Sequence, residues 1–191
     1  MTDRIDVVDG LRSNIHVVDA ASAPLFSVDE CAAILLECGT AAWVDDPGKT
    51  ARSATRKKSG QLLPGGNHGW IGERIAATVA RVNEEIFGFR LVGLEEPIGI
   101  SAYDASRSGY ISAHSDLSAK RSLRKLTFSA LLSDPASFDG GELQFLSGPA
   151  AAARVQGTIT LFPAFLSHEV TPVSRGTRVA IVGWALGPTF V

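Results

Sequence analysis

His114 and Asp116 are the first side chains in this chain whose types and spacing could do chemistry together. Only Ser115 separates them, and in an extended segment residues two apart project from the same face. An imidazole and a carboxylate would then point together, as metal ligands do. The same tripeptide is also common where the two side chains are simply exposed to solvent or hydrogen-bonded to each other, so a metal site requires a further ligand.

His168 is the candidate for that further ligand. It follows an apolar stretch, residues 161–166, which is typical of a strand that delivers a side chain into the interior. Two histidines and one carboxylate form a facial triad on Fe(II), which leaves three positions open for a bidentate 2-oxo acid and O₂. A structural zinc site would instead close its coordination with cysteine or a fourth ligand. We interpret the other histidines, His16 and His68, as structural or solvated.

Arg178 is a candidate anion-binding residue, ten residues beyond the last candidate metal ligand. In a strand it would share one face with Ala180, Val182 and Trp184, and a guanidinium among apolar neighbours is costly unless an anion meets it. The distal carboxylate of 2-oxoglutarate matches the bidentate fork of arginine. A salt bridge to a protein carboxylate or a solvated strand end would also explain Arg178, and Arg175 is interpreted as a solvated turn residue.

The segment 126–132 predicts the wall of a ligand cavity. A strand places alternate residues on opposite faces. One face would then carry a mixture of small polar and apolar side chains, and the other face only apolar ones. The first face holds Thr127, Ser129 and Leu131; the second holds Leu126, Phe128, Ala130 and Leu132.

Short strands separated by turns must position these residues. The pattern predicts strands over residues 89–94, 98–104, 111–114, 125–133, 142–145, 158–162, 169–170 and 179–186, with turns at Asp139-Gly140-Gly141 and Arg175-Gly176-Thr177. Closely spaced strands after a helical preface indicate a mainly β fold with N-terminal helices (α+β). We expect a double-stranded β-helix, a cupin-like jelly roll, with the helices packed on one outer sheet.

The N-terminal half reads as helical support for that core. Ser27 and Glu30 have the spacing of a capping box, followed by an apolar stripe through Cys31, Ile34, Leu35 and Cys38. A second stripe consists of Ile71, Ile75, Val79, Val82 and Ile86, and Gly88 can end that helix. We therefore expect a single domain over 1–191, with helical support over 1–88, a basic Gly/Pro loop over about 45–68, and a catalytic core over 89–191.

The amino-acid composition excludes only the classes of protein whose composition or charge is extreme. The 191 residues are 45% hydrophobic and carry a net charge of −2, which favours neither nucleic acid nor an anionic membrane as a partner. The first six residues lack both a basic and an apolar region, so we expect no secretion signal and a cytoplasmic location. The two cysteines lie two helical turns apart, too far for a disulfide. Nothing in the sequence indicates an oligomeric state.

From Tyr103 to Trp184 the chain resembles the prolyl-4-hydroxylase-like branch of the 2-oxoglutarate/Fe(II) oxygenases. The resemblance covers about the C-terminal half, and its motifs come in the family's order. They are Tyr103 with Gly109-Tyr110 before His114-Ser115-Asp116, then Arg124-Lys125-Leu126-Thr127-Phe128 and Asp139-Gly140-Gly141-Glu142-Leu143, and finally His168-Glu169-Val170 with Pro172, Gly176, Arg178 and Trp184.

The resemblance implies a double-stranded β-helix and the cofactors Fe(II), 2-oxoglutarate and O₂. It implies that the iron ligands are His114, Asp116 and His168, and that Arg178 binds the distal carboxylate. Tyr103 would lie near the co-substrate, together with the inward-facing Thr127 and Ser129, and Trp184 and Tyr110 would line the substrate pocket. The implied reaction is hydroxylation of a C–H bond, with succinate and CO₂ released.

The substrate is open between a free amino acid, a natural-product intermediate and a residue of a peptide. Arg107 could contact a substrate carboxylate, and residues 52–58 could guide an acidic substrate or form a solvated basic loop. Two other functions remain. A non-catalytic jelly-roll module that senses a metabolite would bind its ligand without iron. A metal-dependent isomerase or hydrolase of cupin type would turn over without O₂.

Overall fold

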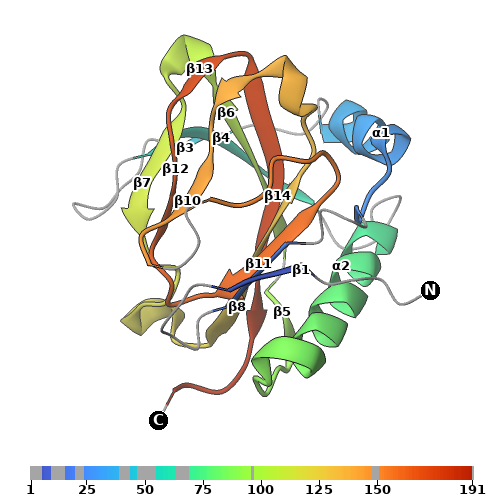
Figure 1. The fold of residues 1–191 in the computed structure, drawn as a ribbon, viewed down its shortest axis with the longest axis vertical. Coiled ribbons are helices and arrows are strands. Elements are labelled where there is room, and N and C mark those ends of the chain that lie inside the picture. Colours follow the sequence, from blue (N-terminus) through green and yellow to red (C-terminus); the bar gives the residue numbers. More distant parts are fainter. Residues whose placement is uncertain are drawn as a thin grey trace.

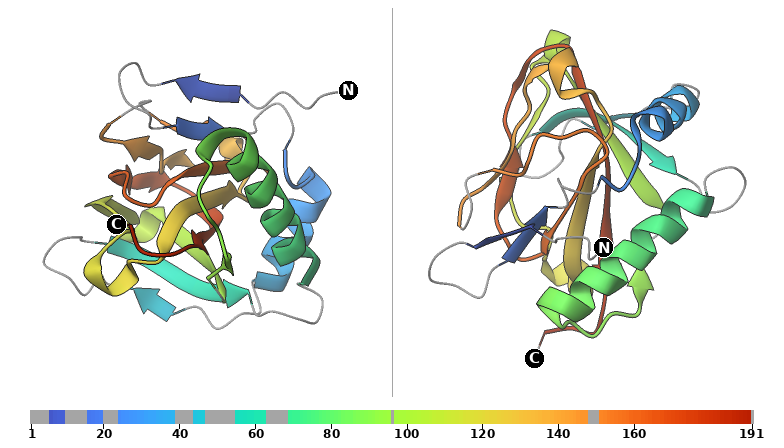
Figure 2. Two further views of the ribbon diagram at one scale, coloured as in Figure 1. Left: turned by 90° about the horizontal axis from the view of Figure 1, so that it is seen from below. Right: turned by 45° about the vertical axis from the view of Figure 1, so that its right-hand side comes forward.

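The structure is a computed structural model of the chain. It describes residues 6–9, 16–19, 24–38, 44–46, 55–62, 69–95, 97–147 and 151–190. Antiparallel strands form the body of the molecule, and two helices lie against one side of it (Figure 1). The helices cover the outer face of one sheet, as the other views also show (Figure 2). This arrangement confirms the predicted class, mainly β with N-terminal helices.

The larger sheet carries the helices on its outer face. Its strands run in the order β1 (Asp6–Asp9), β2 (His16–Asp19), β11 (Ile159–Pro163), β8 (Arg124–Leu131), β14 (Thr177–Leu186), β6 (Ile98–Asp104) and β4 (Thr55–Leu62). Two short strands add to it: β3 (Val44–Asp46) pairs with β4, and β5 (Gly93–Leu94) pairs with β14.

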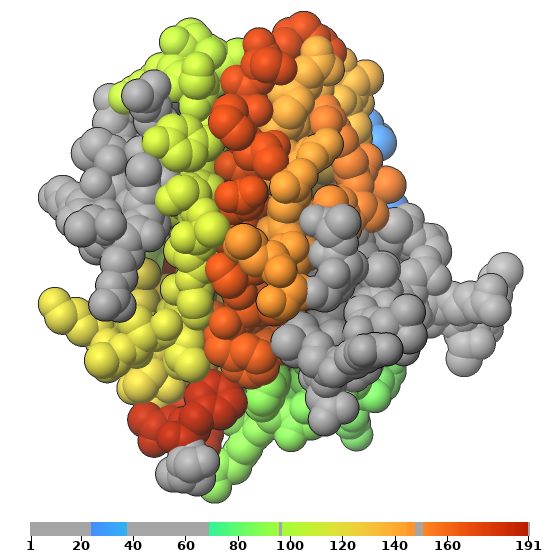
Figure 3. All heavy atoms as spheres, turned by 60° about the vertical axis from the view of Figure 1, so that its left-hand side comes forward, coloured from blue at the N-terminus to red at the C-terminus, as the bar shows by residue number. Residues whose placement is uncertain are grey.

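A second sheet faces the first. From β4 the pairing continues to β7 (Tyr110–His114), β12 (His168–Val170) and β10 (Leu143–Phe145), and β13 (Val173–Arg175) pairs separately with β9 (Asp139–Gly140). Figure 3 views the molecule from this side, where the yellow-green, red and orange segments of the second sheet lie next to one another. Among the described strands the path ends at β1 and β10, so the two sheets do not close into a barrel.

The strand β4 corrects the expected loop over residues 45–68. It pairs with β6 from Lys58 to Leu62 and with β7 at Thr55 and Arg56, so it joins the two sheets. Its sequence, TRKKSGQL, has neither the alternation nor the β-branched content of a typical strand. Pairing with strands on both sides overrides that weak local preference. Residues 52–54 and His68 lie outside the described residues.

The start of the first helix and the end of the second agree with the sequence prediction. The first, α1 (Val28–Cys38), has the expected capping box: the Glu30 amide donates to Ser27 Oγ over 3.1 Å, and the Ser27 amide donates to Glu30 Oε2 over 2.9 Å. The second, α2 (Gly69–Val82), continues into the π-helical turn η2 (Asn83–Phe87). It ends at Gly88, whose positive φ of 65° suits a residue without a side chain.

Two apolar clusters hold these layers together. The larger lies between the helices and the first sheet, and includes the outward face of β8 that the alternation predicted, from Leu126 to Leu132. The smaller lies between the sheets and includes Tyr103, Phe145 and Phe162. Three short 3-10 turns, η3 (Ala105–Arg107), η4 (Ala119–Arg121) and η5 (Pro135–Ser137), connect strands. In the described part of the chain, no helix is both long and apolar enough to cross a bilayer.

Candidate metal centre

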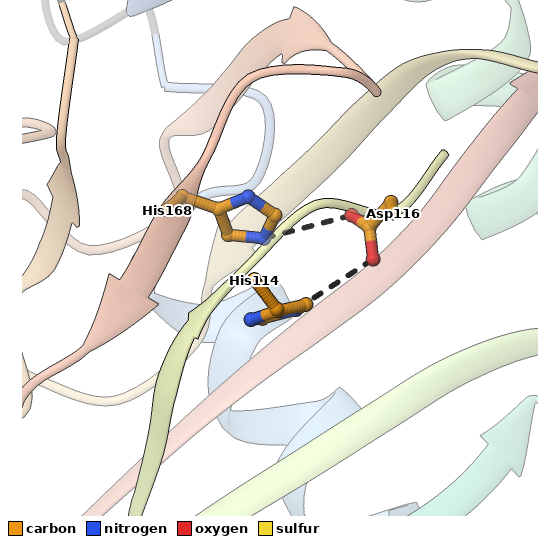
Figure 4. Close-up of side chains that lie close together, drawn as sticks. All are labelled: His114, Asp116 and His168. Carbon is orange, nitrogen blue, oxygen red and sulfur yellow. Dashed lines mark ion pairs between the residues drawn. The ribbon is translucent and has the colours of Figure 1, made fainter. Parts of the chain in front are cut away.

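The two histidines are brought together by strand pairing. His114 is the last residue of β7, and His168 is the first residue of β12. They are direct partners in the antiparallel register, so their side chains lie on the same face and their ring centroids are 4.4 Å apart. Asp116 follows two residues after His114, where the chain leaves β7 (Figure 4).

The three side chains converge on one point, as the sequence predicts. Their ligand atoms all lie within 4.8 Å of one another. Asp116 Oδ1 is 3.7 Å from His114 Nε2, and Oδ2 is 3.5 Å from His168 Nε2. Two nitrogens and a carboxylate at these separations form a facial donor set for a six-coordinate metal such as Fe(II).

Backbone carbonyls orient both imidazoles. Nδ1 of His114 lies 2.9 Å from the carbonyl of Ser112, and Nδ1 of His168 lies 3.0 Å from that of Leu166. A carbonyl only accepts hydrogen bonds, so each Nδ1 carries a proton, and Nε2 is the ring nitrogen left to face the metal position. The ring of His168 is further held by Phe162, whose centroid is 4.7 Å away in an edge-to-face contact.

Burial and charge set the protonation of the site. Burial lowers the pKa of His168; Asp116 opposes this effect and His114 adds to it, so the imidazole is neutral at pH 7. Burial by itself raises the pKa of Asp116. Attraction to His168, the donors of Trp184 and Thr127, and attraction to His114 together hold that pKa below its usual value. His168 is therefore neutral and Asp116 is ionised, which are the forms that bind a metal cation.

Thr127 holds the carboxylate ligand in place. Its hydroxyl donates to Asp116 Oδ2 over 2.8 Å, and both side chains are buried. The sequence placed Thr127 on the cavity side of its strand but gave no sign of this contact. Its neighbour in register, Trp184, lies near enough to lower the pKa of Asp116. The indole Nε1 nevertheless makes no hydrogen bond of ordinary geometry within the described residues.

Arg178 is buried on the inner side of β14, only 5% exposed. It is paired in register with Tyr103, and its guanidinium carbon lies 5.6 Å from the centre of that ring. Within the described part of the chain no carboxylate forms an ion pair with Arg178. Burial is the main cause that lowers its pKa; Tyr103 opposes this effect and Arg154 adds to it. A carboxylate ligand would relieve this cost.

A small cavity, partly open to solvent, lies beside Arg178. The turn at Gly141 borders it, and a Cβ atom at that position would come within 3.0 Å of Arg178 Cδ, so glycine allows the close approach. The triad is not part of the lining. The lining residues are Ser129, Leu131, Phe138, Gly141, Glu142, Leu143, Ala152, Ala153, Arg154, Thr158, Thr160 and Arg178.

The remaining predicted residues are spread over the site and its surroundings. Ser129 lines the cavity, and Trp184 lies at the metal centre. Tyr110 begins β7 and is partly buried, whereas Arg107 lies exposed in η3.

Arg124 packs on Trp184, a contact that the residue patterns did not indicate. Its guanidinium stacks 3.3 Å above the centre of the Trp184 ring, and Glu95 holds it through hydrogen bonds of 2.6 and 2.8 Å. Its third nitrogen, Nη1, is buried and has no hydrogen-bond partner among the described residues, as is also true of Trp184 Nε1. A basic residue opening an apolar strand was the only available signal, and its partner lies 29 residues away.

Comparisons with known proteins agree with this geometry. Residues 98–186 match the family model of the 2OG-Fe(II) oxygenase superfamily. A PKHD-type hydroxylase of Pseudomonas putida (strain W619) is 30% identical over 171 residues, which cover 84% of this chain and 74% of that protein. A PKHD-type hydroxylase of Maricaulis maris is 44% identical over 62 residues, which cover 31% of this chain and 28% of the relative. The chain spans about a third of the length of such shorter-matching relatives.

Solved structures share the fold. A prolyl-4-hydroxylase of Pseudomonas putida superposes with a TM-score of 0.64 at 17% identity, covering 90% of this chain and 92% of that one. A viral collagen prolyl hydroxylase from Paramecium Bursaria Chlorella virus-1, solved with 2-oxoglutarate, gives 0.64 at 16% identity, covering 92% and 97%. The predicted jelly-roll fold is thus confirmed.

Proposed function

The chain belongs to the 2OG-Fe(II) oxygenase superfamily, and from that premise we propose that it hydroxylates a C–H bond of a small amino-acid-like molecule, a natural-product intermediate or a peptidyl residue. The observation that carries the proposal is the convergence of His114, Asp116 and His168, with ligand atoms within 4.8 Å, in a site where the described residues offer no fourth ligand. A closed structural site would need one.

The residues fit Fe(II) by their donor chemistry. Two imidazoles whose Nε2 atoms face one point, together with an ionised carboxylate, suit a divalent first-row metal. The residues also fit 2-oxoglutarate, because Arg178 presents a buried guanidinium without a carboxylate partner in the described part of the chain. We propose that Arg178 binds the distal carboxylate, with Tyr103 and Ser129 beside it.

When bound, the metal and the co-substrate supply the oxidising chemistry, in which O₂ and 2-oxoglutarate yield succinate, CO₂ and one hydroxyl group on the substrate. The chain's own side chains hold and orient the parts. Thr127 and the two backbone carbonyls fix the three ligands, so the site needs little rearrangement to bind metal. Phe145 and Phe162 pack beside His168 and keep bulk water from that side of the centre.

One buried donor beside the metal centre supports a substrate that carries a carbonyl or carboxylate group. Trp184 Nε1 lies beside the metal ligand Asp116, whose pKa it lowers, but it makes no hydrogen bond of ordinary geometry among the described residues. A buried donor left unpaired costs about 1–3 kcal/mol, which a substrate oxygen would recover. Amino acids and peptides supply such an oxygen. We propose that the substrate binds on the Trp184 side of the centre.

The proposal is tested by O₂-dependent formation of succinate from 2-oxoglutarate, with purified protein and Fe(II). We expect slow uncoupled turnover that free amino acids, peptides or a cell extract accelerate, and we expect His114→Ala to abolish it. Arg175→Ala is the matched control, because Arg175 is exposed and bonds only to the turn at Ala136 and Asp139 in the described structure. Ligand binding that needs neither iron nor Asp116 would instead identify a non-catalytic sensor. Turnover without O₂ would identify a metal-dependent isomerase or hydrolase.

A further inference from the structure

Two arginines line the cavity beside Gly141, whereas the proposed binding of 2-oxoglutarate uses only one. Arg178 reaches the cavity from β14, and Arg154 reaches it from the segment that precedes β11. Arg178 is buried and Arg154 is exposed, so the pair forms an inner and an outer cation along the same cavity.

The guanidinium of Arg154 is fixed rather than free in solvent. It lies 4.1 Å from the centre of the Phe138 ring, in a cation–π contact. It donates to the carbonyls of Pro135 over 3.1 Å and Gly140 over 3.3 Å, and also to that of Phe138. These acceptors are neutral, so they hold the head group without cancelling its charge.

Two carboxylates lie close to this cavity, and neither forms an ion pair with Arg154 in the described structure, although the charge of Arg154 contributes to lowering the pKa of Asp139. Asp139 is bound by Arg175 through hydrogen bonds of 2.6 and 3.1 Å. Glu142, which also lines the cavity, accepts from Gln144 Nε2 over 2.6 Å. The positive charge of Arg154 also repels that of Arg178. This repulsion adds to the effect of burial in lowering the pKa of the Arg178 guanidinium. Two like charges at one cavity repel each other unless an anion binds between them.

We propose that Arg154 is a second cation of the co-substrate pocket, which favours dianionic 2-oxo acids over monoanionic ones by charge. The inference rests on the proposed function, since it assumes that the cavity receives the distal end of 2-oxoglutarate. Arg178 would bind the carboxylate directly, and Arg154 would strengthen binding through its field.

The test is the affinity of metal-loaded protein for 2-oxoglutarate, measured by calorimetry without turnover. The protein is loaded with Mn(II) under anaerobic conditions and titrated with 2-oxoglutarate and, separately, with 2-oxopentanoate, which lacks the distal carboxylate. For Arg154→Met, which keeps an unbranched stem over Phe138, we expect about three- to tenfold weaker binding of 2-oxoglutarate at low salt. Binding of 2-oxopentanoate should be unchanged. At about 1 M salt the loss should disappear, because screening is then nearly complete.

Arg175→Met is the matched control. Arg175 donates to the same turn, over 3.1 Å to the carbonyl of Ala136, but it does not line the cavity. If Arg154 only stabilised the turn, both variants would weaken both ligands alike. The inference is overturned if Arg154→Met binds 2-oxoglutarate as the wild type does, if the loss extends equally to 2-oxopentanoate, or if Arg175→Met shows the same loss. Wild-type protein that binds no 2-oxoglutarate would overturn the proposed function itself.

Discussion

The hydrogen bond from Thr127 to Asp116 predicts a specific loss of metal affinity in the variant Thr127→Val. Valine has nearly the same shape as threonine but lacks the hydroxyl that donates to Asp116 Oδ2 over 2.8 Å. Both residues are buried, so water cannot easily replace the missing donor. The carboxylate would then be free to rotate away from the metal position, and its pKa would rise.

The magnitude follows from the kind of bond that is lost. A hydrogen bond to a charged group contributes about 1.5–3 kcal/mol. Each 1.4 kcal/mol corresponds to about a tenfold change in an equilibrium constant. We therefore expect Thr127→Val to bind Fe(II) about ten- to a hundredfold more weakly, in the range seen when an outer partner of a metal ligand is removed.

The assay is anaerobic competition for Fe(II) against a coloured chelator. Thr177→Val is the matched control, because the hydroxyl of Thr177 also donates to a carboxylate, that of Asp104, which is not a ligand candidate. The reasoning is refuted if Thr127→Val binds the metal within about twofold of the wild type, or if Thr177→Val loses as much affinity.

Three further predictions concern the packing and the ionisation of the fold. Glu95→Gln should lower the free energy of unfolding in urea by about 2 kcal/mol, because it leaves the buried Arg124 without its anion; no loss would contradict the pairing. Gly183→Ala should cost about 1–3 kcal/mol in the same assay, because the added Cβ would lie 2.3 Å from Phe128 Cζ; an unchanged midpoint would show that the ring can move. Burial raises the pKa of Cys31 from 9.0 to about 11, so the folded state keeps a proton that the unfolded chain releases, and stability should fall between pH 9 and 11. The free energy of unfolding should fall less over this pH range in Cys31→Ala. Equal slopes of that free energy against pH in the two proteins would contradict the prediction.

A glycine in α2 provides the control for the packing prediction. A Cβ atom at Gly72 would meet only Ile98 Cδ1, at an ordinary contact distance of 3.7 Å. Alanine also favours a helix over glycine by up to about 1 kcal/mol. Gly72→Ala should therefore stabilise the protein, whereas Gly183→Ala destabilises it.

Part of the metal site was predictable because the spacing of His114 and Asp116 is local, whereas the approach of His168 depends on the pairing of β12 with β7. In an extended segment His114 and Asp116 project together whatever the rest of the fold does, and an apolar stretch before His168 indicates a strand that ends in the interior. The alternation in β8 likewise predicted which side faces the helices, since Leu126 and Phe128 are both fully buried in the outer cluster.

The parts that the sequence did not reveal depend on contacts between distant segments. The strand β4 has weak local preference and exists because β6 and β7 pair with it. The bond from Thr127 to Asp116 requires the register between β8 and the end of β7, which no local pattern encodes. The stacking of Arg124 on Trp184 joins residues from two strands in the same way.

The most direct test of the central claim is an anaerobic titration of the protein with Fe(II) in the presence of 2-oxoglutarate, followed by visible absorption. We predict a weak charge-transfer band that saturates at one iron per chain and is absent in His114→Ala. A folded wild-type protein that develops no such band would contradict the assignment of His114, Asp116 and His168 as a shared iron site.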